Sequence, residues 1–376
     1  MKKVCHLSSA HNRYDIRIFE KECRTLADNG FDTYLVVNDD NPSEHKEGIT
    51  IISTGYRPNN RIDRIINSKR RMLEVAIKTE AVIYHLHDPE LLQIALKLKK
   101  NGGKVIFDSH EDVPSQILGK HWIPKIFRNA VSKTYCKYER YVLTKLDAVI
   151  SVTPHLTERL IKINKNAVEV TNYPRIESKE PVSNNRQRAV CFAGGISPQW
   201  MHEHIVNAVE KIGNIKYFLC GLGSNDYLTK LKALNGWNQV EYLGKIPHSE
   251  VQEIYNQAMV GMAVASYNKN VKGNLGTLGN TKLFEIMMAG LPVICTDFIL
   301  WEKIIDDCQC GICVKPDNVE EIASSIRYLL DNPDVAKQMG ENGRRAVVEK
   351  YNWGVEEKKL IKLYQDLLEK QEEKKQ

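Results

Sequence analysis

The chain has 376 residues, of which 42% are hydrophobic and 27% are charged, and its formal net charge is +6 at pH 7. This length exceeds one ordinary hydrophobic core and suits two domains, while the ordinary composition argues against a disordered chain. No apolar run approaches the roughly 20 residues that span a bilayer, and no signal-peptide core follows the first residues, so we expect a cytoplasmic protein.

Short apolar segments alternate with helical ones through the first half of the chain. Helical periodicity covers 16–29, and the predicted strands are 3–8, 33–37, 49–53, 81–86, 104–108, 148–152 and 167–171. This alternation is typical of a doubly wound parallel sheet with helices on both faces. We therefore predict a Rossmann-like domain over residues 1–174.

The segment 175–187, which contains prolines and many polar residues, has the composition of an exposed linker. A second alternating series follows, with predicted strands at 189–193, 216–220, 240–243, 261–265, 292–296 and 311–314. Residues 188–350 are therefore predicted to form a second Rossmann-like domain, and residues 351–376 a charged amphipathic helix. The predicted fold class is α/β, with two doubly wound parallel-sheet domains facing a cleft.

The residues that follow the predicted strands are unusually polar. Ligands of open parallel sheets bind beyond the carboxyl ends of the strands, so these positions are the first candidates for a site. They are His11, Asp15, His87, Asp88, Glu90, Asp108, His110 and Glu111 in the first half and Gly194, Gly195, Gly221 and Gly244 in the second. His110 follows an apolar strand and stands among acids, which favours a functional over a purely structural histidine. Asp88 precedes Pro89 and is predicted to cap the helix that begins there.

Imidazole and carboxylate side chains are suitable ligands for divalent metal ions. No ligand spacing, such as two histidines on one helical face, supports a metal site, and we expect none. The nine cysteines include a close group, Cys308, Cys310 and Cys313, which lacks a fourth zinc ligand at a suitable spacing. We expect the cysteines to be reduced and to serve in packing.

A glycine-rich polar loop, 273–281, leads into a predicted helix that begins near Lys282. Its last backbone amides and the ammonium group of Lys282 suit a diphosphate, whereas a mobile surface loop with an ordinary first-turn lysine is the alternative. The spacing is not that of a P-loop. Glu285 lies one turn on in an otherwise apolar helix, where its carboxylate needs partners. Those partners are either the two hydroxyls of a ribose or a salt bridge within the protein.

The segment between Gly119 and Lys145 is strongly basic. Its basic residues are Lys120, Lys125, Arg128, Lys133, Lys137, Arg140 and Lys145, against the single acid Glu139, and they are interleaved with Trp122, Ile123, Ile126 and Phe127. A basic helix with aromatic residues favours contact with an anionic membrane surface or a phosphate-bearing partner. The alternative is a solvated helix whose apolar side packs in the core.

These motifs resemble family four of the retaining glycosyltransferases with the GT-B fold, particularly members that assemble bacterial surface polysaccharides such as capsule or exopolysaccharide. The likeness covers nearly the whole chain and rests on residues 11–19, 87–91, 108–111 and 280–292 and on the ending around 351–353. It implies transfer of a sugar, with retention at the anomeric carbon, from a nucleoside-diphosphate sugar such as a UDP-sugar to a hydroxyl of a lipid-linked or oligosaccharide acceptor. It further implies no metal or other cofactor, no nucleic acid as a partner, and a place on the inner face of the cell membrane.

The resemblance also assigns roles to individual residues. The second domain binds the donor, with the ribose on Glu285, the base on the amides that follow Gly244, and the diphosphate near Lys282. The implied donor set is Gly195, Gly221, Gly244, Lys245, Ile246, Gly279, Asn280, Thr281, Lys282 and Glu285. The implied catalytic residues are His110, Lys282 and Glu285, and the acceptor-side residues are His11, Asp15, His87 and Glu111. The last helix is expected to cross back to the first domain.

The chain departs from the family's pattern in two places. Thr277 stands eight residues before Glu285, where a second glutamate is common, and Trp200 and Met201 stand where arginine and lysine are common. Because the protein must offset the charge of the leaving diphosphate, we predict that Lys282 supplies the main positive charge. Two other functions fit the same architecture, a nucleotide-sugar epimerase and a non-catalytic partner subunit.

Overall fold

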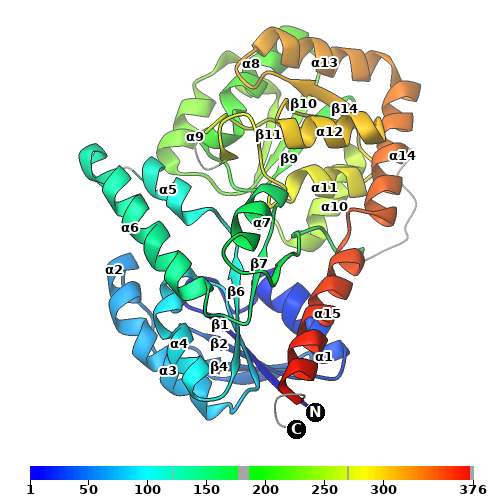
Figure 1. Ribbon diagram of the computed structural model, residues 1–376. Coiled ribbons are helices and arrows are strands. Elements are labelled where there is room, and N and C mark those ends of the chain that lie inside the picture. Colours follow the sequence, from blue (N-terminus) through cyan, green and yellow to red (C-terminus); the bar gives the residue numbers. More distant parts are fainter. Residues whose placement is uncertain (121, 177–185, 269–270, 373–376) are drawn as a thin grey trace. The chain divides into compact units, whose positions relative to one another are not determined.

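The computed structural model describes residues 1–120, 122–176, 186–268 and 271–372 (Figure 1). The chain divides into two compact units, Met1–Asn172 with Trp353–Gln376, and Tyr173–Asn352. The C-terminal helix α15, Trp353–Glu372, therefore belongs to the N-terminal unit. Most of the predicted linker, 175–187, lies outside the described residues.

The N-terminal unit contains an eight-stranded sheet in the order β3-β4-β2-β1-β5-β6-β7-β8. Its strands are β1 (Lys3–Ser8), β2 (Asp32–Val37), β3 (Glu44–Lys46), β4 (Ile49–Ser53), β5 (Ile83–Leu86), β6 (Lys104–Ser109), β7 (Ala148–Ser151) and β8 (Ala167–Glu169). Every described neighbouring pair is parallel except β3 with β4. The sequence does not predict β3, because its three residues are polar and partly or fully exposed.

Helices cover both faces of this sheet. They are α1 (Arg24–Asp28), α2 (Arg61–Asp63), α3 (Lys69–Lys78), α4 (Leu92–Lys100), α5 (Val113–Gly119), α6 (Lys125–Leu143), α7 (Pro154–Ile161) and α15. Figure 1 shows α3, α4 and α6 on one side and α1 and α15 on the other. The predicted helix over 16–29 is divided, since a π-helical segment, Ile18–Cys23, precedes α1. A second π-helical segment, Arg64–Ser68, precedes α3, and a 3₁₀ turn, Pro89–Leu91, precedes α4.

Helix α15 is part of the core of the N-terminal unit. Its buried apolar side chains pack with Val4, Ile83 and Ile106 from the sheet. The indole Nε1 of Trp353 donates a hydrogen bond of 2.8 Å to the hydroxyl of Thr25. Burial of a large aromatic with its polar atom satisfied is strongly stabilising, so α15 is fixed to the face of this sheet.

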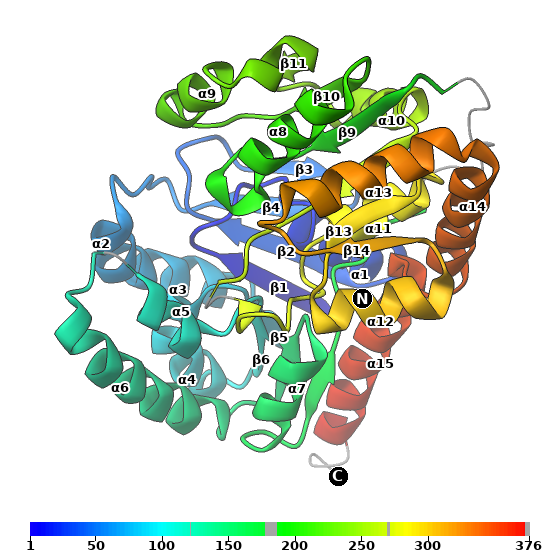
Figure 2. The same ribbon diagram turned by 90° about the horizontal axis from the view of Figure 1, so that it is seen from above.

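The C-terminal unit contains a six-stranded parallel sheet in the order β11-β10-β9-β12-β13-β14. Its strands are β9 (Ala189–Ala193), β10 (Lys216–Cys220), β11 (Val240–Gly244), β12 (Val260–Ala263), β13 (Val293–Thr296) and β14 (Gly311–Val314). Its helices are α8 (His202–Ile212), α9 (Asn225–Lys232), α10 (His248–Gln257), α11 (Lys282–Met288), α12 (Ile299–Cys308), α13 (Val319–Asp331) and α14 (Pro333–Glu349), with 3₁₀ turns at Pro198–Trp200 and Asn235–Gln239. Figure 2 shows α8 beside α13, and α11 packs against α14.

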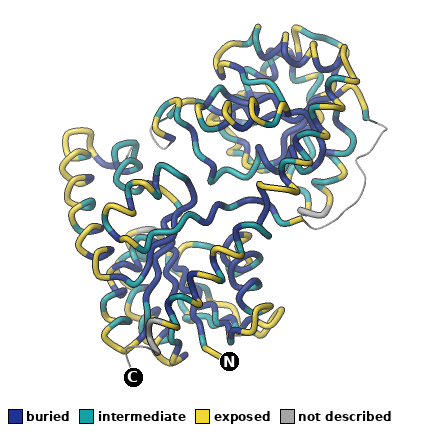
Figure 3. The backbone as a smooth tube through the Cα atoms, turned by 45° about the vertical axis from the view of Figure 1, so that its right-hand side comes forward, coloured by how far each residue is buried: buried dark blue, intermediate teal, exposed yellow. Residues whose placement is uncertain are grey.

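The strands form the buried interior of each unit, whereas the outer helices present exposed faces (Figure 3). Near-continuous apolar strands of this kind are expected in parallel sheets that are covered on both sides. All nine cysteines are free. Within the described residues, no helix combines the length and the apolar character needed to cross a membrane.

Candidate active site

A cavity of about 490 Å³ opens in the N-terminal unit at the carboxyl ends of β1, β5 and β6. Side chains that follow these strands line one wall, including His11, His87 and His110, and residues of the α5 and α6 region line the other, including Trp122 and Tyr135. This is the edge at which the strand-end rule places a ligand. All residues of the first predicted group except Asp15 therefore line a cavity.

Asp88 fixes the loop that follows β1. Its Oδ2 accepts hydrogen bonds from the backbone amides of Ser9 (2.6 Å) and Ala10 (3.1 Å), and its Oδ1 lies 3.2 Å from Nδ1 of His11. The side chain makes no capping hydrogen bond to the turn that follows it. Asp88 therefore holds the predicted N-cap position before Pro89, but the predicted capping role of its side chain is wrong. Asp88 is structural because it ties the end of β5 to the loop after β1.

The contact between Asp88 and His11 shifts both pKa values. Burial raises the pKa of the Asp88 carboxyl, but the hydrogen bond and charge of His11 outweigh burial and hold this pKa well below its usual range. Burial alone lowers the pKa of His11, but the hydrogen bond and charge of Asp88 outweigh it, so the pKa of His11 is raised. The pair is therefore an ion pair when His11 is protonated.

Asp108 is a fully buried carboxylate at the end of β6. Its Oδ2 accepts a hydrogen bond of 2.8 Å from Nε of Arg17 and lies 3.0 Å from Nε2 of His110 and 3.5 Å from Nδ1 of His87. Burial raises the pKa of Asp108, but the charge of Arg17 outweighs it, so the pKa is held well below the usual range and the carboxylate stays ionised. Burial lowers the pKa of His87 to about 4 despite the contact with Asp108, so this imidazole is neutral at pH 7.

His110 is oriented by Asp108 and lines the cavity. Its Nε2 contacts the carboxylate, no described residue forms a hydrogen bond with its Nδ1, and the side chain is 19% exposed. A carboxylate on one ring nitrogen fixes the orientation of an imidazole and leaves the other nitrogen to a ligand. The structure thus places His110 at a cavity, and it supplies a partner, Asp108, to which the sequence assigned no role.

The other predicted acceptor-side residues differ in their placement. His11, His87 and Glu111 line the cavity. Asp15 is not among the lining residues. Its Oδ1 accepts a hydrogen bond of 2.9 Å from the backbone amide of Arg17, which fixes the start of the π-helical segment. Its role in binding an acceptor stays a prediction without a geometric counterpart.

Helix α6 forms the outer wall of the cavity and presents both apolar and basic groups to solvent. Trp122, just before it, is 67% exposed, and Ile126 and Phe127 are 82% and 58% exposed. The alternative of an apolar side packed in the core therefore fails for these three residues. The single acid, Glu139, is buried and its carboxylate lies 2.5 Å from Arg159, so it does not offset the exposed basic charge.

The structure also joins side chains of the type that bind metal ions, although the sequence shows no ligand spacing. They are His87, Asp108 and His110 in the cavity wall, and His6, Glu22, His85 and His87 beneath it. The pairing of β1, β5 and β6 brings the histidines and Asp108 together, and the π-helical segment Ile18–Cys23 adds Glu22, which explains why no local motif predicts these groups.

In the C-terminal unit, three strand-end glycines lie side by side. A Cβ on Gly221, which has φ of +137°, would stand 1.7 Å from the carbonyl oxygen of Gly194, so only glycine fits there. The amide of Gly221 donates a hydrogen bond of 2.7 Å to the carbonyl oxygen of Gly244. Gly195 is exposed and has open space around its Cβ position. The ends of β9, β10 and β11 thus present bare backbone, followed by exposed Lys245.

Lys282 lies over this glycine junction and is paired with Glu285. The Cε of Lys282 stands 2.8 Å from the position of a Cβ on Gly194. Its Nζ donates a hydrogen bond of 2.5 Å to Glu285, which also accepts one of 2.5 Å from the hydroxyl of Thr281. The salt-bridge alternative for Glu285 is therefore what this structure shows. The same carboxylate supplies the anion that a lysine in a first helical turn requires.

The loop before α11 forms internal hydrogen bonds that the sequence does not predict. The amide of Gly279 donates a hydrogen bond of 3.1 Å to Thr277, and the amide of Lys282 donates one of 3.1 Å to the side chain of Asn280. In this structure the Gly279 amide is therefore engaged within the loop, and its part in phosphate binding stays a prediction. The carbonyl of Thr277 also accepts a hydrogen bond of 2.8 Å from the indole of Trp301, which fixes the loop to α12.

Comparison with known protein families gives one match for each of the two units. Residues 18–172 match the family Glycosyltransferase Family 4, and residues 175–346 match Glycosyl transferases group 1. An uncharacterized glycosyltransferase of Methanocaldococcus jannaschii is 23% identical over an alignment of 262 positions, which covers 65% of this chain and 64%, or less than two thirds, of that protein.

Solved structures match the chain over almost its full length. Sucrose-phosphate synthase from Thermosynechococcus elongatus has a TM-score of 0.75 at 17% identity, over 98% of this chain and 99% of that one. HepE of Anabaena, in complex with UDP-glucose, has a TM-score of 0.69 at 12% identity, over 97% of this chain and 100% of that one. These likenesses confirm the predicted fold class: two parallel-sheet α/β domains of the GT-B type.

Proposed function

We propose that this chain, which is built from two glycosyltransferase domains, transfers a sugar from a nucleoside-diphosphate sugar to an acceptor hydroxyl with retention at the anomeric carbon. The observation that carries the proposal is the position of Lys282, whose ammonium group lies beside Glu285 and whose side chain lies over the glycine junction of β9 and β10. A cation and a carboxylate beside exposed backbone are the groups that a diphosphate and a ribose need.

The donor in this proposal binds the C-terminal unit. Glu285 accepts hydrogen bonds from the ribose, and Lys282 then turns from Glu285 to the diphosphate. The amides of Lys245 and Ile246 face the base, and backbone at Gly195 and Gly221 allows close approach. A uridine nucleotide is the first candidate because the structure of HepE, which has the same fold, holds UDP-glucose.

The N-terminal unit contributes the acceptor side. His110, oriented by Asp108, contacts the sugar or positions the acceptor hydroxyl through its Nδ1. His11, His87 and Glu111 line the same cavity. The protein neutralises the leaving diphosphate with Lys282, so the proposed transfer step uses no metal ion.

The proposed acceptor is a lipid-linked saccharide of a bacterial surface polysaccharide, reached at the cytoplasmic face of a membrane. The support is the surface of α6, where Trp122, Ile126 and Phe127 are exposed among basic residues and the only acid is buried. Exposed apolar side chains within a basic surface suit anionic lipid.

The proposal is tested first with a panel of nucleoside-diphosphate sugars. A donor that binds the native state raises the thermal midpoint, and that donor is then incubated with and without lipid-linked or oligosaccharide acceptors. We expect slow donor hydrolysis without acceptor, and a glycosylated product whose anomeric configuration matches the donor. Conversion of one nucleotide sugar into another without acceptor would instead establish an epimerase, and nucleotide binding without turnover on any acceptor would establish a non-catalytic subunit.

A further inference from the structure

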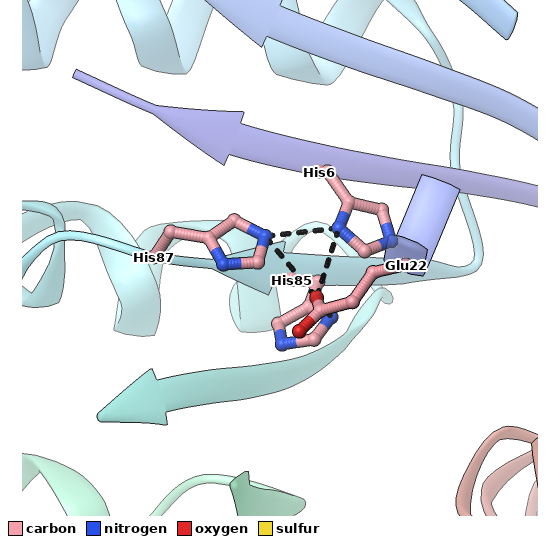
Figure 4. Close-up of side chains that lie close together, drawn as sticks. All are labelled: His6, Glu22, His85 and His87. Carbon is pink, nitrogen blue, oxygen red and sulfur yellow. Dashed lines mark hydrogen bonds and ion pairs between the residues drawn. The ribbon is translucent and has the colours of Figure 1, made fainter. Parts of the chain in front are cut away.

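A cluster of three histidines and a glutamate lies beneath the cavity of the N-terminal unit (Figure 4). His6 comes from β1, His85 from β5, His87 from just after β5, and Glu22 from the π-helical segment Ile18–Cys23. All four side chains are fully buried. Figure 4 shows the rings of His6 and His87 directed toward the Glu22 carboxylate, with His85 beside it.

The ligand atoms are spaced as a small cation requires. Nδ1 of His6 lies 2.9 Å from Nε2 of His87. Oε2 of Glu22 lies 3.8 Å from Nδ1 of His6, 3.7 Å from Nδ1 of His85 and 3.8 Å from Nε2 of His87. Four ligands at about 2.0 Å from a tetrahedral zinc ion are about 3.3 Å apart, which lies between these distances.

The charges around the cluster favour a cation. Two fully buried carboxylates, Glu22 and Asp108, share one guanidinium, that of Arg17, whose Nε lies 3.0 Å from Glu22 and 2.8 Å from Asp108. Apart from the ion pair with Arg17 and the contact with Asp108, neither oxygen of Glu22 has a well-aligned hydrogen bond with a described residue. Two buried carboxylates that share one guanidinium are costly unless a further cation or a proton compensates them.

We infer that this cluster binds a divalent ion of the zinc class through Nδ1 of His6, Nε2 of His87 and the carboxylate of Glu22, with His85 as the fourth ligand. Nitrogen and carboxylate donors suit zinc and its neighbours in the first transition row. With four protein ligands and no contact with solvent, the site has the closed form of a structural ion rather than the open form of a catalytic one.

The groups around the ligands orient them as metal sites commonly do. The second nitrogen of His6, Nε2, lies 3.1 Å from the hydroxyl of Tyr364 on α15, and the second nitrogen of His87, Nδ1, lies 3.5 Å from Asp108. An oxygen partner on the outer nitrogen fixes a ligating imidazole. Nδ1 of His85 lies 2.9 Å from the same hydroxyl, so His85 completes the site only when Tyr364 moves from it.

The ion would stabilise the cavity by fixing the side chain of His87. His87 has one nitrogen in the cluster and the other beside Asp108, which orients His110. An ion on the inner nitrogen therefore fixes the ring that forms the floor of the cavity. The inference does not rest on the proposed transfer of a sugar, because its readouts are metal content and stability.

The test uses the full chain, purified with an affinity tag that contains no histidine and without chelators. After growth with added zinc, elemental analysis should find about one zinc per chain, and cobalt exchange should give the visible absorption of a four-coordinate ion bound by nitrogen and oxygen. Removing zinc with dipicolinate should lower the thermal midpoint, and returning zinc should restore it. Glu22→Gln and His6→Gln should each lose the ion, with folding checked by circular dichroism.

His45→Gln is the matched control, since His45 is an exposed histidine on β3 of the same unit, and it should retain the ion. The inference is overturned if the wild-type chain holds no zinc and its thermal midpoint does not change when zinc is added. This result does not depend on whether the variants fold. Undiminished zinc in folded Glu22→Gln and His6→Gln overturns it as well. Sulfur-to-cobalt charge-transfer bands would assign the ion to the cysteines instead, with the same consequence. After any of these three results, the buried carboxylate of Glu22 is compensated by a proton and not by a metal ion.

Discussion

Replacing Lys282 with methionine tests whether this lysine neutralises the leaving diphosphate. The side chains of Lys282 and Glu285 are 21% and 19% exposed, so giving up their ion pair costs about 0.2 to 1 kcal/mol. Losing one charge-assisted contact in the transition state costs about 2 to 4 kcal/mol. The second effect is larger, so Lys282→Met should lower kcat/KM about 30-fold to about 900-fold.

Glu285→Gln separates the two roles of this pair. It removes the anion that holds Lys282, so inorganic pyrophosphate should bind up to about fivefold more tightly, from a gain of at most about 1 kcal/mol. A nucleoside diphosphate also loses the ribose contact and should bind more weakly. The two probes thus move in opposite directions only if Glu285 holds the ribose and Lys282 the phosphates.

The assay measures turnover with the best donor and the affinities of both probes by calorimetry. Lys303→Met, which removes an exposed lysine on α12 of the same unit, is the matched control and should change neither quantity. If Lys282→Met keeps turnover and diphosphate affinity within a few-fold of wild type, the lysine is not the phosphate ligand. Equal weakening of pyrophosphate and nucleoside diphosphate by Glu285→Gln would show that the pair does not compete with phosphate.

Three further predictions concern the N-terminal unit. His110→Ala should lower turnover more than donor affinity, and an unchanged rate at saturating substrates would return His110 to a structural role. The double change Ile126→Ser and Phe127→Ser should weaken sedimentation with anionic vesicles, as should added salt, whereas Ile161→Ser, at an isoleucine 50% exposed on α7, should not. The pKa of His11 is raised above 6.5, so its pair with Asp88 stabilises the fold fully below that pH and less as pH rises through the raised pKa. Urea unfolding should therefore show His11→Gln less stable than wild type near pH 6 and closer to it near pH 9, and a constant difference would contradict this.

The alternation of apolar and helical segments predicts most of the fold, because buried parallel strands are short, apolar and bounded by polar turns. Most predicted strands agree with the structure to within one or two residues, as for β2 at Asp32–Val37. The exception, β3, consists of polar residues and is defined only by its antiparallel pairing with β4. The π-helical segment Ile18–Cys23 also escapes prediction, since its periodicity is close to that of an α-helix.

The strand-end rule predicts the residues that line the cavity but not the buried cluster beneath it. His87 and His110 follow strands and line the cavity. His6 and Glu22 lie within a strand and a helical segment, where an isolated polar residue gives no signal until the strands are paired. Arg17 is the partner of Asp108 across 91 residues of sequence. Such charges are located by tertiary packing, which no local pattern encodes.

The loop after β9 has apolar side chains at Trp200 and Met201, so in our proposal the positive charge at the strand ends comes from Lys282 on α11. Trp200 is nearly buried, with its ring 5.0 Å from that of Phe192, and Met201 adopts the left-handed φ of +47° as it enters α8. In these positions the chain therefore has apolar side chains, of which Trp200 packs on β9. Gly194, at the end of the same strand, lacks the Cβ that would collide with Cε of Lys282. Lys282 thus reaches the strand ends from α11, over Gly194. In the same region, the loop after β9 has no positively charged side chain at Trp200 and Met201. A Gly194→Ala change should displace Lys282 and weaken diphosphate binding without touching any charge, and unchanged binding in that variant would separate the glycine from the lysine.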